Sequence, residues 1–332
     1  MGSAQPHDLT PMPKPQEDLV KPAFEERYRK LLGDGGYERF LTYSFSYLRK
    51  SLRVNTLKVG VDELKRRLVD RWELVPVPWC PEGFWISYKG DEDQEERFDL
   101  GNLPEHPLGY FYVQDAASMI PPVVLDPQPG EVVLDLCAAP GSKTTQLAAM
   151  MRNGGLVVAN DLQGGRLSAL GINTQRVGAK NVMVTRMPGQ RFRRFGGFDK
   201  VLVDAPCSGT GTIRRSMKVL QMWSPNLVRR MAKVQRGLVR AAFEALKPGG
   251  VLVYSTCTLE PEEDEGVVSW LLERYPGAEV LPIALDIRRS PAVMEFEGQA
   301  YHDAVRECLR IYPPDNDSEG FFVAKIRKPS SG

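Results

Sequence analysis

The sequence has no long run of apolar residues, no excess of charge of one sign and no Cys-x-x-Cys spacing. A membrane-spanning helix needs about 20 apolar residues, so no membrane partner is expected. The net charge of +1 excludes a uniformly basic nucleic-acid coat but allows a local basic patch. The five cysteines are odd in number, which argues against a disulfide framework or a structural zinc site. We therefore expect a reducing, cytoplasmic environment and no bound metal.

The composition is that of a globular protein with room for two domains. The chain has 332 residues, of which 42% are hydrophobic and 26% charged. Its first residues lack the apolar core of a signal peptide, and residues 1–22 are polar and proline-rich, so we expect a disordered tail there. Arginine outnumbers lysine by 28 to 15, which suits an RNA partner without requiring one.

Residues 23–110 are expected to form an N-terminal region in which a helix precedes a small α+β module. The spacing of apolar residues changes from helical to alternating along this region. The acidic segment 91–96 predicts a solvated loop. The expected elements are a helix over 23–50 that breaks near Gly33, a helix over 61–68, and strands over 52–58, 72–77 and 83–88.

Residues 111–328 predict an α/β domain with a doubly wound, Rossmann-like parallel sheet. From about residue 130, short apolar strands alternate with amphipathic helices, as crossover connections require. The expected strands are 132–136, 156–160, 181–185, 200–204, 250–255 and 321–326, and the expected helices are 143–152, 164–177, 224–246 and 261–274.

A loop of small residues follows the first strand of this sheet. Ala139 and Gly141 let a ligand approach the backbone, and the next helix offers free N–H groups to an anion. Cys137 and Ser142 stand where a P-loop needs glycine, and no Gly-x-Gly-x-x-Gly pattern is present. Asp161 ends the second strand, where a carboxylate commonly binds a ribose diol; a turn cap is the alternative. Adenosine with a small zwitterion matches S-adenosylmethionine.

Two cysteines follow later strands of the same sheet. Cys207 lies in Asp-Ala-Pro-Cys-Ser-Gly and Cys257 in Tyr-Ser-Thr-Cys-Thr, so both thiols should emerge at the carboxyl edge of the sheet. Their polar, turn-forming neighbours separate them from Cys80, Cys137 and Cys308, which we interpret as small buried hydrophobic residues. A disulfide between Cys207 and Cys257 is not expected in the cytosol.

A thiol pair beside a sulfonium donor suits methylation of cytosine. A thiolate that adds to carbon 6 makes carbon 5 nucleophilic; loss of the carbon-5 proton and β-elimination of the sulfur then free the enzyme. The scheme needs a nucleophile, a group that hydrogen-bonds the ring and a group that helps release. Cys257, Asp204 and Cys207 are the candidates.

Six motifs in the same order resemble the Sun/Nop family of RNA cytosine-C5 methyltransferases. The resemblance implies a Rossmann-like methyltransferase domain, S-adenosylmethionine as cofactor, and an RRM-like RNA-binding module in the N-terminal region. Together the motifs extend over about 50–328, and they begin at Arg53, Tyr112, Leu136, Asp204, Tyr254 and Gly320.

The resemblance also implies roles for individual residues. Cys257 would attack cytosine, Cys207 would promote release of the product, and Asp204 would contact the cytosine and the donor. Asp161 would bind the ribose of the donor, with Arg166 on the same side. The loop around the donor would consist of Cys137, Ala138, Ala139, Pro140, Gly141, Ser142 and Lys143.

Three positions depart from the family pattern. Pro188 replaces an aspartate that reads adenine, Pro314 replaces a frequent histidine, and Glu319 replaces a common aspartate. Adenine must therefore be held in another way, and Pro188 can contact it only through its backbone.

Basic clusters at 191–194, 214–218 and 229–236 are candidate RNA contacts. The second follows Cys207 by seven residues, where arginines can hold a strand while the target base leaves its stack. The third is equally well explained as a solvated helix face. For Trp223, core packing is favoured over stacking on a base.

We expect a monomeric enzyme that makes 5-methylcytosine in tRNA, with rRNA as an open alternative. The loop around Gly141 and the sequence Ala-Asn-Asp ending at Asp161 are most similar to family members that act on tRNA. A catalytically silent RNA-binding assembly factor is a second hypothesis, which the two cysteines and Asp204 argue against. A third, an amino methyltransferase, needs an Asn/Asp-Pro-Pro-Tyr/Phe loop where this chain has Asp-Ala-Pro-Cys.

Overall fold

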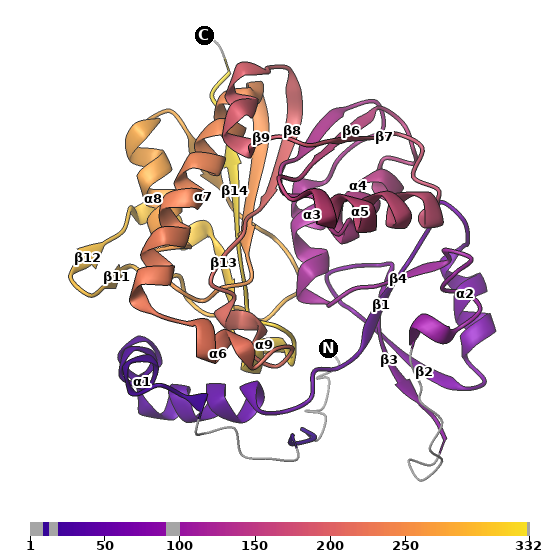
Figure 1. The fold of residues 1–332 in the computed structure, drawn as a ribbon, viewed down its shortest axis with the longest axis horizontal. Coiled ribbons are helices and arrows are strands. Elements are labelled where there is room, and N and C mark those ends of the chain that lie inside the picture. The colour runs from indigo at the N-terminus through magenta and orange to yellow at the C-terminus, as the bar shows by residue number, and fades with distance from the viewer. Residues whose placement is uncertain (1–8, 13–18, 91–99, 331–332) are drawn as a thin grey trace.

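The computed structural model describes residues 9–12, 19–90 and 100–330. An eight-stranded sheet and a separate four-stranded sheet organise these residues (Figure 1). Most of the expected tail and the acidic segment 91–96 lie outside the described residues. None of the described helices is both long and apolar enough to cross a membrane.

The large sheet confirms the Rossmann-like prediction and is mixed at one side. Its order is β10-β14-β9-β8-β5-β6-β7, with β13 beside β14, and β5 to β9 are parallel. The chain runs outward from β5 and returns on its other side as β8, which makes the switch point where such sheets bind ligands. The strands are β5 (Val132–Asp135), β6 (Leu156–Asn160), β7 (Val182–Thr185), β8 (Phe198–Asp204), β9 (Leu246–Thr256), β10 (Glu279–Leu281), β13 (Leu309–Ile311) and β14 (Phe321–Arg327).

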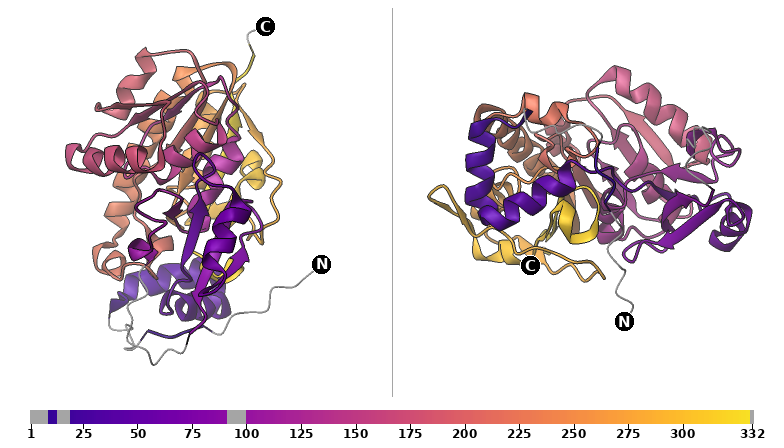
Figure 2. Two further views of the ribbon diagram at one scale, coloured as in Figure 1. Left: turned by 90° about the vertical axis from the view of Figure 1, so that its right-hand side faces the viewer. Right: turned by 90° about the horizontal axis from the view of Figure 1, so that it is seen from below.

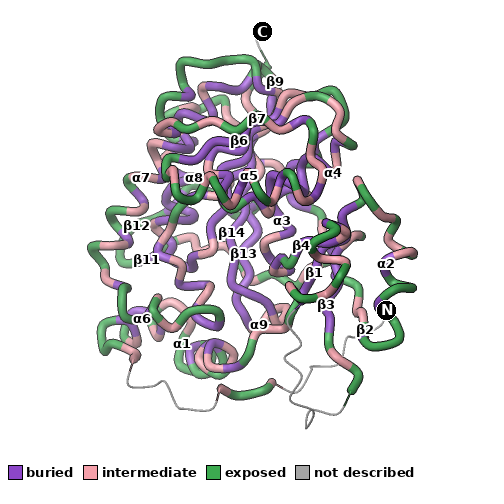
Figure 3. The backbone as a smooth tube through the Cα atoms, turned by 45° about the vertical axis from the view of Figure 1, so that its right-hand side comes forward, coloured by how far each residue is buried: buried purple, intermediate pink, exposed green. Residues whose placement is uncertain are grey.

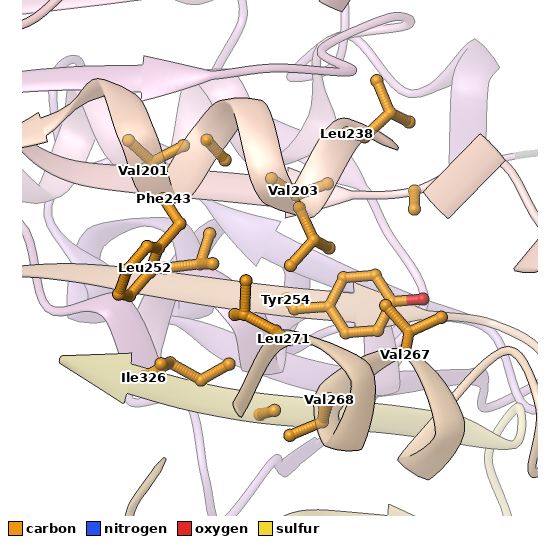
Figure 4. Close-up of a cluster of buried hydrophobic side chains, with 14 of the residues drawn as sticks. Val201, Val203, Leu238, Phe243, Leu252, Tyr254, Val267, Val268, Leu271 and Ile326 are labelled. Carbon is orange, nitrogen blue, oxygen red and sulfur yellow. The ribbon is translucent and has the colours of Figure 1, made fainter. Parts of the chain in front are cut away.

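Helices cover both faces of this sheet because its strands are apolar on both sides. Val203 and Tyr254 pack with Leu238 and Val267 from the helices on one face (Figure 4). Leu202 alternates to the other face. The helices are α3 (Ile120–Leu125), α4 (Ser142–Met150), α5 (Gly164–Val177), α6 (Lys218–Met222), α7 (Pro225–Ala245), α8 (Glu265–Arg274) and α9 (Pro313–Asn316). The tube in Figure 3 shows how completely β13 and β14 are buried.

The small sheet is antiparallel, with the order β2-β3-β1-β4. The strand predicted over 52–58 ends early because the backbone turns at Asn55, whose side-chain amide donates to Gly109 O and Val177 O. The boundary predicted at 110 falls directly before β4, which pairs with β1. The elements are β1 (Ser51–Val54), α2 (Val61–Leu68), β2 (Trp72–Pro76), β3 (Gly83–Tyr88) and β4 (Phe111–Val113); a hairpin of β11 (Glu295–Phe296) and β12 (Gln299–Ala300) lies apart.

Helix α1 (Pro22–Ser44) packs beneath the large sheet instead of joining the small one (Figure 2). It ends before the predicted residue 50, and Gly33 interrupts it with a φ of 70°. Phe24 meets Trp223 edge to face, and the Trp223 indole, 1% exposed, donates to Glu260 at 2.8 Å. Core packing of Trp223 is therefore confirmed, and the stacking role is wrong.

Candidate active site

The two predicted thiols lie side by side at the carboxyl edge of the large sheet. Cys207 follows β8 and Cys257 follows β9, and these strands pair in parallel up to Asp204 and Ser255. The two Sγ atoms are 3.3 Å apart. Both residues are partly exposed, and all five cysteines are free thiols. A substrate can therefore reach this pair of sulfurs.

Hydroxyl groups join the two cysteine loops. Thr258 Oγ1 lies 2.7 Å from Ser208 Oγ and 3.0 Å from Thr210 Oγ1. The backbone N–H of Gly211 donates to Cys257 O at 3.0 Å. Because these contacts are buried, they hold the two sulfurs in a fixed relation.

A buried carboxyl, not foreseen from the sequence, lies behind Cys207. Glu263 Oε2 accepts from Ser208 N at 3.0 Å and from Gln235 Nε2 at 2.7 Å. Burial raises the pKa of Glu263 to about 8, so this carboxyl is mostly protonated at neutral pH. Glu263 is fully buried in the fold, although it lies in the acidic run 260–265.

The hydrogen bond to Cys257, followed by burial, raises the pKa of Cys207 well above its usual value. Cys207 therefore retains its proton at neutral pH. Its S–H group can donate toward the Sγ atom of Cys257 across the 3.3 Å between them.

An ion pair connects the thiols to the loop after β5. Lys143 Nζ donates to Asp204 Oδ2 at 2.7 Å and to Ser118 Oγ at 2.9 Å. Ser255 Oγ donates to Asp204 Oδ1 at 2.9 Å. Burial alone would lower the pKa of Lys143, but the Asp204 carboxylate raises it overall, so the ammonium stays charged. Ser118 and Ser255 were not predicted, because ordinary serines carry no signal of such a role.

The loop between β5 and α4 has the open backbone that a donor site requires. Gly141 has a φ of 107°, and a Cβ there would lie 2.9 Å from Leu170 Cδ1. Asp161 Oδ2 accepts from Ala139 N at 3.2 Å, and Arg166 donates to Ala139 O beside it. The predicted carboxylate and loop therefore meet at the switch point.

Beneath this loop, Asp135 Oδ1 is buried without a hydrogen-bond partner among the described residues. Burial raises the pKa of Asp135 to about 7, although Thr144 Oγ1 donates to the other oxygen at 2.7 Å. Burial also raises the pKa of Cys137, so that thiol is inert. The small residues of the loop and the two carboxyls, Asp135 and Asp161, fit an adenosine donor with an amino-acid tail. Pro188 lies directly before the turn η4 (Gly189–Arg194) and offers no carboxylate to adenine.

One predicted RNA contact is wrong. Arg214 is 4% exposed and donates to the backbone oxygens of Ser46 and Tyr47 and to Asp317. These hydrogen bonds connect the segment after α1 to the catalytic domain. The Arg214 guanidinium is therefore not available to bind a phosphate. Arg215 and Lys218, from the same cluster, are exposed.

Comparisons with known proteins agree with this geometry. Residues 122–327 match the model of 16S rRNA methyltransferase RsmB/F, and residues 20–116 match the N-terminal domain of 16S rRNA methyltransferase RsmF. The chain belongs to the RsmB/F family. The predictions of the family, of RNA cytosine-C5 methyltransferase chemistry and of S-adenosylmethionine as cofactor are thereby confirmed.

Relatives of this RsmB/F-family chain include proteins named for tRNA and proteins named for ribosomal RNA. It is 47% identical to the tRNA (cytosine(49)-C(5))-methyltransferase of Pyrococcus abyssi, over 92% of this chain and 95% of that protein. It is 45% identical to ribosomal RNA small subunit methyltransferase F of Shewanella amazonensis, over 88% of this chain but only 61% of that protein.

Solved structures share the whole architecture. A methyltransferase homolog from Pyrococcus horikoshii superposes with a TM-score of 0.82 at 37% identity, over 94% of this chain and 97% of that one. NSun6 from the same organism, solved with the S-adenosylmethionine analogue SFG, has a TM-score of 0.81 at 24% identity, over 94% and 99%. The second likeness shows the fold alone. Within residues 9–12, 19–90 and 100–330, no cluster of His, Cys, Asp or Glu could hold a metal ion.

Proposed function

We propose that this RsmB/F-family chain makes 5-methylcytosine in tRNA. The observation that carries the chemistry is the pair of sulfurs 3.3 Å apart, next to the Asp204–Lys143 ion pair. The choice of tRNA is supported by the relative named for tRNA, of which this chain covers 95%, against 61% of the relative named for rRNA. Ribosomal RNA is the second candidate, supported by the match of residues 20–116 to the N-terminal domain of RsmF.

In the proposed reaction the thiolate of Cys257 adds to carbon 6 of cytosine. S-adenosylmethionine, when bound, supplies an electrophilic methyl group to carbon 5. Asp204, fixed by Lys143 and Ser255, hydrogen-bonds the polar edge of the ring. Solvent water takes the carbon-5 proton, and the electrons of that C–H bond form the C5–C6 double bond while the bond between sulfur and carbon 6 breaks. Cys207, adjacent to that sulfur, assists this release by donating its proton to the departing thiolate.

The remaining assignments belong to the same proposal. Asp161 and Arg166 hold the ribose side of the donor, and the loop from Cys137 to Lys143 surrounds its amino-acid part. Residues 23–110 form an RNA-binding region and 111–328 the methyltransferase domain. The protein works as a monomer in the cytoplasm, where thiols remain reduced.

Trapping of the covalent intermediate tests the proposed chemistry. We expect Cys207→Ala, incubated with unmodified tRNA transcript and S-adenosylmethionine, to accumulate a protein–RNA adduct that survives a denaturing gel. Cys257→Ala and the double variant should give no adduct. Normal methylation by both single variants would contradict the covalent scheme.

Bisulfite sequencing tests the substrate. Unmodified tRNA transcripts and 16S rRNA are incubated separately with the protein and S-adenosylmethionine. We expect protected cytosines in tRNA, with position 49 the first to inspect. Protection confined to 16S rRNA would replace tRNA by the second candidate.

A further inference from the structure

A cleft of about 250 Å³ lies between the small sheet and the methyltransferase domain. Val113 and Asp115 line it at the end of β4, and Arg49 and Lys50 line it before β1. Arg215, from the catalytic domain, lines the opposite wall together with Glu319. The cleft belongs to neither the donor loop nor the thiol pair.

Short connections join this cleft to the reacting centre. Gly320, next to Glu319, donates its N–H to Gly211 O at 2.9 Å, and Gly211 N donates to Cys257 O at 3.0 Å. On the other wall, Asp115 Oδ1 accepts from Ala117 N at 2.8 Å. The next residue after Ala117 is Ser118, which holds Lys143. The walls of the cleft are therefore directly connected to the loops that carry Cys257 and Lys143.

The charges of the cleft suit an anion. Arg49, Lys50 and Arg215 line the cleft; Arg49 lies 3.9 Å from Asp317 Oδ2, whereas the Arg215 side chain is 72% exposed. Burial, reinforced by Asp115, raises the pKa of Glu319 to about 8, and burial raises that of Asp115 as well. At neutral pH the Glu319 carboxyl is therefore mostly protonated and cancels little of the positive charge.

Glu319 carries a polar atom without a partner. The residue is 3% exposed, and its Oε1 makes no hydrogen bond in the part of the chain that the structure describes. Arg215 Nη1 lies 3.8 Å from that oxygen, too far for a hydrogen bond. A buried polar atom of this kind is costly unless a ligand satisfies it. Val113, which is 44% exposed, adds an apolar surface beside it.

We infer that this cleft binds one sugar–phosphate unit of the RNA strand next to the target cytosine, with the phosphate on Arg215 and a ribose hydroxyl on Glu319. The inference rests on the proposed function, because it takes the strand to enter at Cys257. Recognition of a 2′-hydroxyl distinguishes RNA from DNA at such a position. The cleft would therefore contribute to the choice of nucleic acid as well as to affinity.

Substitution of Arg215 tests the phosphate contact. We expect Arg215→Ala to weaken binding of a fluorescein-labelled, unmodified tRNA transcript about tenfold in anisotropy titrations, and to reduce the slope of log K against log salt by about 1. Arg274→Ala, which removes the same charge from an exposed position on α8, should bind like the wild type. In methyl-transfer assays the Arg215 variant should raise KM and leave kcat within about twofold, because the contact positions the strand.

Substitution of Glu319 tests the hydroxyl contact. Glu319→Gln keeps a donor and an acceptor and should bind the transcript within about threefold of the wild type, whereas Glu319→Ala should lose about tenfold. Wild-type binding by both Arg215→Ala and Glu319→Ala would overturn the inference. The anisotropy titration needs no catalysis, so it decides about the cleft even if the wild type fails to methylate the transcript, a result that would overturn the proposed function instead.

Discussion

The donor half of the active edge, at the ends of β5 and β6, differs in construction from the thiol half, at the ends of β8 and β9. In the donor half, backbone groups fix the strand-end carboxylate: Asp161 accepts from Ala139 N and from Gln163 N. In the thiol half, side chains hold one another, as Glu263 does with Gln235. One half depends on backbone shape, and the other depends on buried polar side chains.

This difference separates binding from chemistry. A loop held by its own backbone presents a preformed surface to a cofactor. The thiol half places a proton-retaining Cys207 and a mostly neutral Glu263 around one sulfur, so it responds to pH. The ion pair between Lys143, from the donor loop, and Asp204, at the end of β8, connects the two halves. Substitutions in the thiol half should therefore reduce methyl transfer, and substitutions in the donor half should weaken binding of S-adenosylmethionine.

The largest expected effect follows loss of the nucleophile. Cys257→Ala should reduce methyl transfer by about 10³-fold or more, because the variant lacks the thiolate that adds to carbon 6 of cytosine. Binding of S-adenosylmethionine, measured by isothermal titration calorimetry, should stay within about twofold. A large loss of donor affinity would show that the two halves are not separable.

A carboxylate in the donor half should show the opposite pattern. Asp161→Ala should weaken binding of S-adenosylmethionine by about 10–100-fold, since a hydrogen bond to a charged group contributes about 1.5–3 kcal/mol. At saturating donor, kcat should fall less than about tenfold. Unchanged donor affinity in the same calorimetric measurement would remove Asp161 from the ribose site.

The smallest expected effect concerns stability and pH. The folded-state pKa of Glu263, about 8, exceeds its ordinary value of 4.5, so the folded protein keeps a proton that the unfolded chain releases between these values. Glu263 therefore makes the wild type less stable as the pH rises through this window. Glu263→Gln should flatten the fall in Tm between pH 5 and 8.5.

Glu273→Gln, at an exposed position on α8, is the matched control for that measurement and should leave the pH dependence unchanged. Thermal unfolding followed by circular dichroism gives both curves. Identical slopes for wild type and Glu263→Gln would mean that Glu263 is ionised in the folded protein.

Much of the fold was predictable because local patterns and global packing agree. The predicted helix 164–177 and strand 156–160 match α5 and β6 in both bounds. Helix α5 ends where Gly178 adopts a φ of 75°, a stop signal visible in the sequence. The order of the sheet from β5 to β9 follows from right-handed crossovers.

The errors occurred where long-range packing overrode local signals. Arg214 looked like an RNA contact from its neighbours, but Ser46 and Asp317 from distant segments enclose it. The sequence also gave no sign that Arg310 and Arg27, from distant segments, form ion pairs with buried carboxyls in the acidic run after Cys257. Helix α1 lies within residues 20–116, which match the N-terminal domain of RsmF, and its apolar residues also contact Trp223 in the catalytic domain.

The order of residues along the chain was sufficient to predict that two thiols, a small-residue loop and a strand-end carboxylate lie at one edge of the sheet, because each lies in a short motif next to a strand. Tertiary structure alone decided that the sulfurs stand 3.3 Å apart, that Ser118 steadies Lys143, and that Glu263 is buried and protonated. These features depend on desolvation and on partners tens of residues away, which spacing in a sequence does not encode.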